Sequence, residues 1–259
     1  SAAHRPCVAV GRFPAGTRAE LDAMVRKTVS YETQSRPGPW QRRLHLIAGA
    51  PNFNPQIDAL INTFAAGLFA NGIPQAYEVT MTHGQTGSAY CYPPERFEER
   101  VIELFDQGAL FIAYVGHGQP DAAMPVTGFA QGKIMDRETV RRVQCPAESR
   151  PVAFFIACDM ARFDGPEDSV AEAAVKAEGG PVAVVGSARF SHPYGNAILG
   201  MELMAALLDG REPTLGRCLL KAQNRVAAPV PLYDLVRQGI DGASGLPEPV
   251  RRRELNAHV

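Results

Sequence analysis

The chain has 259 residues, of which 46% are apolar, 20% charged and 8% aromatic, a globular composition that excludes a disordered chain, a collagen-like repeat and a disulfide-rich scaffold. Its 26 Lys and Arg residues are balanced by 27 Asp and Glu residues, and a formal net charge of −1 argues against DNA or RNA as a partner. The longest apolar runs, such as 152–158, are far shorter than the roughly 18 residues of a membrane-spanning helix, so we expect no membrane span.

Helices and strands alternate along the first half of the sequence. Thr17 and Glu20 form a capping-box pattern at the start of the first helix. Asn54, followed by Pro55, is typical of the first residues of another helix. In chain order, the pattern predicts a helix over 17–32, a strand over 44–48, a helix over 55–71, a strand over 77–82 and a helix over 94–107.

The second half contains three runs, 110–115, 152–157 and 181–185, that are apolar at almost every position. Strands of this kind are buried on both faces and belong to parallel sheets covered by helices on each side. Helices are predicted between and after them over 136–143, 166–178, 196–209 and 214–225. No long linker or repeat interrupts the alternation, so we expect one α/β domain over 1–259, a mainly parallel sheet in an α/β/α sandwich, with a poorly specified tail from about 231.

Functional side chains of open parallel sheets gather at the carboxyl ends of the strands. There, one apolar run leads into Gly116-His117-Gly118 and another into Cys158-Asp159. If these two strands are neighbours, about 4.8 Å apart, a thiol and an imidazole leave the same edge of the sheet. This arrangement favours a nucleophilic Cys158 with His117 as its acid–base partner.

The amides of Gly118 and Cys158 are the candidate donors to the oxyanion that such a reaction forms. Each part also has a purely structural interpretation, because a cysteine after a strand is often a small buried apolar residue and a Gly-His-Gly segment is often only a tight loop. A zinc hydrolase is a third possibility, but the six histidines show no His-x-x-x-His spacing and the five cysteines no Cys-x-x-Cys pair. We therefore expect no metal site and no cofactor.

Several segments together resemble the catalytic domain of the gingipain family of cysteine peptidases. They are 10–14 (Val-Gly-Arg-Phe-Pro), Tyr31-Glu32, 114–118, 156–158 with Phe163-Asp164, and 180–189, and the resemblance runs from about 8 to 223. It implies a caspase-like α/β fold, peptide or protein substrates, and peptide-bond hydrolysis by Cys158 and His117. It also implies a secreted or periplasmic bacterial protein. Because the family usually continues beyond the point that matches Val259, we expect the sequence to be part of a longer protein.

The resemblance also implies a substrate pocket, to which it assigns Asp58, Ser187, Arg189 and Tyr194. Asp58 would pair with a basic side chain at P1, the residue before the cleaved bond. Arg189 would instead pair with an acidic P1 side chain, as in caspase pockets. The family's acidic partner of the histidine falls near Pro51, where this chain has no carboxylate. We expect a cysteine endopeptidase with basic P1 preference, the alternatives being acidic preference through Arg189 or a catalytically silent domain that binds peptides or a partner protein.

Overall fold

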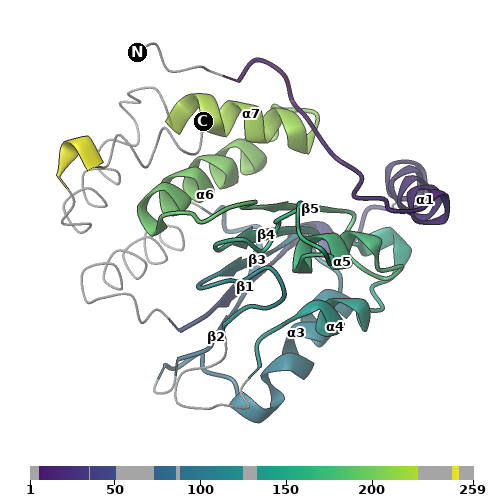
Figure 1. The fold of residues 1–259 in the computed structure, drawn as a ribbon, viewed down its shortest axis with the longest axis horizontal. Helices are drawn as coiled ribbons and strands as arrows, with labels where there is room; N and C mark the ends of the chain where they lie inside the picture. The colour runs from purple at the N-terminus through teal and green to yellow at the C-terminus, as the bar shows by residue number, and fades with distance from the viewer. Residues whose placement is uncertain are drawn as a thin grey trace. The chain divides into compact units, whose positions relative to one another are not determined.

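The computed structural model describes residues 6–34, 36–50, 73–85, 88–124, 133–226 and 247–250 (Figure 1). The chain divides into two compact units. One contains 13–50 and 75–190, and the other contains 1–12, 51–74 and 191–259. The single domain expected over 1–259 stays a prediction.

Within the described residues, the first unit is built on a five-stranded sheet in which every neighbouring pair of strands is parallel. The strand order is β2-β1-β3-β4-β5. The strands are β1 (Arg43–Ala48), β2 (Glu78–His83), β3 (Phe111–Val115), β4 (Val152–Ile156) and β5 (Ala183–Gly186). All five lie within two residues of their predicted bounds, and the predicted parallel α/β architecture is confirmed.

Helices α3 (Phe97–Asp106), α4 (Arg137–Arg141) and α5 (Val170–Lys176) lie along one face of this sheet (Figure 1). Their apolar side chains form one buried cluster with strand residues such as Tyr114 and Phe155. Phe111 and Phe154 are buried as well. Phe111 lies three positions from Tyr114, and Phe154 lies one position from Phe155. Both separations are odd, so these two side chains are on the other face. The central strands are therefore covered on both sides, which explains why their sequences are continuously apolar.

Helix α1 (Arg18–Gln34) begins at the predicted capping box. The N–H of Glu20 donates to the Thr17 hydroxyl at 3.2 Å, and the Glu20 carboxylate accepts from the N–H groups of Gly16 and Thr17. Farther along, the buried Lys27 amine donates to the Val175 and Ala177 carbonyl oxygens at 2.5 and 2.8 Å. Lys27 thus joins α1 to the last turn of α5.

Two helices of this unit begin clearly later than predicted. Helix α3 begins at Phe97 because Pro94–Arg96 form a 3-10 turn before it. Helix α5 begins at Val170 and not at Pro166, because Ser169 and Glu172 form a reciprocal capping box. The Ser169 hydroxyl accepts from the Glu172 N–H at 3.3 Å, and the Glu172 carboxylate accepts from the Ser169 N–H at 3.0 Å. Residues 159–168 consequently form a loop between β4 and α5.

In the second unit, α6 (Pro193–Leu208) and α7 (Leu215–Val226) pack against each other. Lys221 of α7 pairs with Asp209 at the end of α6, with 3.0 Å between nitrogen and oxygen. The helix predicted over 55–71 and most of the tail after 231 lie outside the described residues. None of the helices that are described combines the length and apolarity needed to cross a bilayer.

Candidate active site

The candidate nucleophile and base follow neighbouring strands. β3 and β4 are paired in parallel, with Val115 opposite Ile156. His117 and Cys158 each come two residues later, so they occupy equivalent positions beyond the same edge of the sheet. Both are half-buried. The two strands are therefore adjacent, as the sequence-based prediction of a Cys158/His117 pair requires.

Gly118 brings the two strand ends into close contact. A Cβ atom built on Gly118 would lie 2.7 Å from the Cys158 carbonyl oxygen, 2.6 Å from Met160 Cγ and 2.9 Å from Ala157 Cβ. These separations are too short for any side chain, so glycine is required where the backbone after His117 passes the backbone of Cys158. Among the described residues the Gly118 N–H meets no acceptor, which leaves this amide as a candidate oxyanion donor.

Tyr114 fixes the His117 backbone from inside the sheet. Its hydroxyl is fully buried and donates to the His117 carbonyl oxygen at 2.7 Å. A Cβ atom on Gly116 would lie 2.6 Å from that hydroxyl oxygen, and one on Gly49 would lie 2.9 Å from it. Burial raises the pKa of Tyr114 well above its usual value, so the hydroxyl keeps its proton as a donor. The sequence indicates Tyr114 as a residue of an apolar strand and of the segment 114–118 that resembles the family, but nothing in its pattern predicts this hydrogen bond.

The residue after Cys158 turns the chain sharply. Asp159 has φ = 56°, in the left-handed region that asparagine and aspartate tolerate better than other non-glycine residues. Its N–H donates to the Arg189 carbonyl oxygen at 3.2 Å, and its own carbonyl oxygen accepts from the Arg162 N–H at 2.9 Å. The turn that directs the chain away from Cys158 is therefore tied to the loop after β5.

Two of the four predicted pocket residues lie in that loop. The Ser187 hydroxyl donates to the Arg189 carbonyl oxygen at 2.7 Å. The Arg189 guanidinium binds both oxygens of Asp164 at 2.9 and 3.2 Å and lies 5.6 Å from the centre of the Phe163 ring. The charge of Arg189 is thus engaged by the loop that follows Cys158. The other two residues, Asp58 and the side chain of Tyr194, lie outside what the structure describes.

Other histidines and cysteines lie in different environments. His45 on β1 is 2% exposed, and burial, with Arg100 and Arg43 nearby, lowers its pKa to about 4. Burial raises the pKa of the Cys145 thiol to about 11, and it raises the pKa of Cys218 as well. Cys7 is exposed and Cys91 half-buried. In the described part of the chain, no group of three His, Cys, Asp or Glu side chains is placed to hold a metal ion.

Comparison with known proteins gives the following matches. The model of peptidase family C25 matches residues 1–243. The crystal structure of the Arg-specific cysteine proteinase gingipain R (RgpB) is 19% identical with a TM-score of 0.63, over 90% of this chain and 51% of that chain. The complex of Porphyromonas gingivalis RgpB pro- and mature domains is 19% identical with a TM-score of 0.65, over 92% of this chain and 53% of that chain. A comparison with curated proteins gave no match.

The chain therefore spans about half the length of these two solved structures. At this level of identity the likeness concerns the fold. The gingipain-like α/β fold that the sequence predicted is confirmed.

Proposed function

The chain belongs to peptidase family C25, and from this membership we propose that it hydrolyses peptide bonds with Cys158 as nucleophile and His117 as general acid and base. One observation carries the residue assignment. His117 and Cys158 stand at equivalent positions beyond two adjacent parallel strands, and Gly118 packs directly against the Cys158 carbonyl group. A thiol and an imidazole so placed can act on one carbonyl group of a bound peptide.

The proposed reaction has two steps. The Cys158 thiolate attacks the carbonyl carbon of the scissile bond, and the His117 imidazolium gives its proton to the leaving amine, which produces a thioester with Cys158 and a free amino terminus. His117 then takes a proton from water, the water oxygen attacks the thioester carbon, and the Cys158 thiolate leaves and is again paired with imidazolium. The Gly118 and Cys158 amides would hold the oxyanion in both steps, at about 3 kcal/mol per donor.

We further propose that the preferred P1 side chain is basic and that Asp58 binds it. Two observations support this. A protein that shares the fold, gingipain R, is an Arg-specific cysteine proteinase. In addition, Arg189, the residue that would favour an acidic P1 side chain, already has its guanidinium bound by Asp164. An acidic substrate would have to compete with that carboxylate.

The test is a library of fluorogenic peptides that varies only at P1, assayed with the wild type and with Cys158→Ala. We expect cleavage after Arg or Lys by the wild type and none by the variant. Cleavage after Asp that is lost in Arg189→Ala would contradict the basic preference but not the Cys158/His117 pair. Peptide binding without cleavage by the wild type would support a catalytically silent domain instead.

A further inference from the structure

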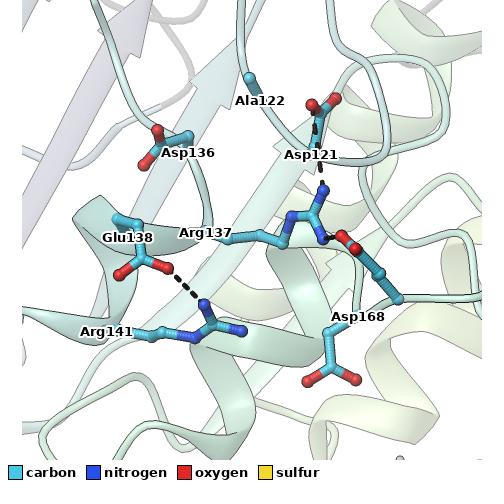
Figure 2. Close-up of a pocket in the computed structure, with 8 residues that line it drawn as sticks. Asp121, Ala122, Asp136, Arg137, Glu138, Arg141 and Asp168 are labelled. Carbon is cyan, nitrogen blue, oxygen red and sulfur yellow. Dashed lines mark hydrogen bonds and ion pairs between the residues drawn. The ribbon is translucent and has the colours of Figure 1, made fainter.

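An open pocket is bounded by three segments, two of which are the loops that follow His117 and Cys158 (Figure 2). Asp121 lies in the loop after His117, Glu167 lies in the loop after Cys158, and the first turn of α4 lies between these loops. The lining carries five carboxylates and two guanidinium groups. The two loops that carry the candidate nucleophile and base therefore meet around one set of charges.

Arg137, at the start of α4, is the side chain that contacts both loops. Its guanidinium pairs with Glu167, and it also lies 3.9 Å from the Asp121 carboxylate. Figure 2 shows the Arg137 side chain directed toward Asp121. Its main-chain N–H donates to the Asp121 carbonyl oxygen at 3.3 Å, and its side chain is only 24% exposed. One residue of α4 is thus connected to the loop of His117 and to the loop of Cys158.

Arg141, one turn later on the same helix, provides the natural comparison. Its guanidinium pairs with Glu138 of its own helix, and Figure 2 shows these two side chains together at the wall of the pocket. Arg141 has the same charge as Arg137 and lines the same pocket. Among the described residues, however, its ion pair with Glu138 is local and joins no loop.

Two main-chain contacts show that these loops are coupled to the candidate site. The Met124 N–H donates to the His117 carbonyl oxygen at 3.1 Å, so residues 117–124 form one closed loop. The Val170 N–H donates to the Pro120 carbonyl oxygen at 2.8 Å, which joins this loop to the start of α5. Without the Arg137 guanidinium, the Asp121 and Glu167 carboxylates would lose the cation with which both of them pair.

We propose that Arg137 is a positioning residue that holds the His117 loop and the Cys158 loop at a fixed separation. The proposal rests on the function proposed above for those two residues. Isolated surface ion pairs contribute little to stability, whereas a pair within a network, held by a partly buried arginine, can fix a geometry. Arg137 should therefore affect the reaction rate more than it affects folding or substrate binding.

The test compares Arg137→Gln with its matched control Arg141→Gln, which removes the same charge from the same pocket. We expect Arg137→Gln to lower kcat about fivefold with KM changed less than twofold, and Arg141→Gln to change neither beyond twofold. The alkylation of Cys158 by iodoacetamide, followed against pH, provides a readout that does not need peptide cleavage. Its pH–rate profile should shift in Arg137→Gln and not in Arg141→Gln.

Glu167→Gln supplies a second variant at an exposed position that should not impair folding. It should produce part of the Arg137→Gln effect, and the double variant should be no worse than Arg137→Gln alone, since both changes break one contact. Equal effects of Arg137→Gln and Arg141→Gln, or additive effects in the double variant, would overturn the proposal. If the wild type cleaves no peptide but the alkylation profile still shifts only in Arg137→Gln and Glu167→Gln, the positioning role stands and the peptidase function fails.

Discussion

Two pairs of the same residue types lie in contrasting regions of the sheet unit. His117 and Cys158 stand at its carboxyl edge, half-buried. His45 and Cys145 lie in its interior, where His45 is 2% exposed and Cys145 is 4% exposed. Burial lowers the pKa of His45 to about 4 and raises that of Cys145 to about 11. At neutral pH the interior pair is therefore an uncharged imidazole and a protonated thiol.

The comparison teaches that the place of a side chain in the fold decides its chemistry. A nucleophilic thiol needs a thiolate, and a general acid and base must gain and lose a proton near neutral pH. The interior of the sheet suppresses the formation of the thiolate and of the imidazolium, because burial disfavours charged side chains. The edge leaves both side chains within reach of solvent and of a substrate, so the predictions below set edge residues against interior ones.

The largest effect is expected for the edge histidine. His117→Ala should lower kcat by about 10²–10⁴-fold, because general acid–base catalysis alone contributes that much. His45→Leu should leave kcat within about twofold. Activity should also survive chelators, since the proposed mechanism uses no metal. Steady-state kinetics on the P1 library measure all three, and loss of activity with EDTA that zinc specifically restores would overturn the thiol mechanism.

The second effect concerns the two thiols. Brief, substoichiometric iodoacetamide at pH 8 should label Cys158 and leave Cys145 unmodified, because a thiol with a pKa of about 11 is thiolate in about one molecule in a thousand at that pH. Cys218 is buried and should be inert too. Peptide mass mapping of the alkylated protein provides the measurement. Preferential labelling of Cys7, Cys91, Cys145 or Cys218 would contradict the assignment of Cys158.

The position of His117 and Cys158 at the edge of the sheet is predictable from the sequence, because the apolar runs determine where the strands end. The strands over 44–48, 110–115 and 152–157 were predicted within one residue of their observed bounds, and β3 and β4 are adjacent, as the argument required. Each of these runs has five or six residues and is apolar at almost every position, and the last two are rich in Val, Ile and Phe, which is typical of strands buried on both faces of a parallel sheet. The positions of His117 and Cys158 beyond their strands follow from this alone.

Contacts between loops were not predictable. Arg137 pairs with Glu167, 30 residues away in the chain, and no local pattern links these residues. The hydrogen bond from Tyr114 to the His117 carbonyl depends on the close approach of Gly49 and Gly116, which belong to different strand ends. Likewise, no local pattern in the sequence predicts the pairing of Arg189 with Asp164, with which an acidic substrate would have to compete.

A third, smaller effect concerns Asp58, the proposed binding residue for a basic P1 side chain. Asp58→Ala should lower kcat/KM for Arg substrates about a hundredfold, because a carboxylate that faces a guanidinium makes a charge-assisted contact that no neutral residue replaces. The melting temperature should hardly change. Asp22→Ala, which removes a carboxylate from the exposed side of α1, is the matched control. Equal kcat/KM values for Asp58→Ala and the wild type would show that Asp58 does not bind the P1 side chain.

The smallest effect concerns the interior histidine and is a change of stability. Both ring nitrogens of His45 are buried without a hydrogen-bond partner among the described residues, and its pKa of about 4 in the fold compares with about 6.5 in an unfolded chain. Between these two values the unfolded state binds more protons than the folded state, so stability is present above pH 6.5 and is lost as the pH falls toward 4. From pH 7 to pH 5 this linkage should cost about 2 kcal/mol.

Urea unfolding of wild type and His45→Leu at pH 7 and pH 5 measures this difference. His45→Leu should lose less stability than the wild type over that interval, by about 2 kcal/mol, because leucine takes up no proton. At pH 7 the two proteins should be similarly stable, since the imidazole is already neutral and makes no hydrogen bond among the described residues that leucine would remove. The same pH dependence in the two proteins would show that the folded protein tolerates a protonated His45. Burial would then not control the protonation of the interior histidine, which would contradict the contrast between edge and interior.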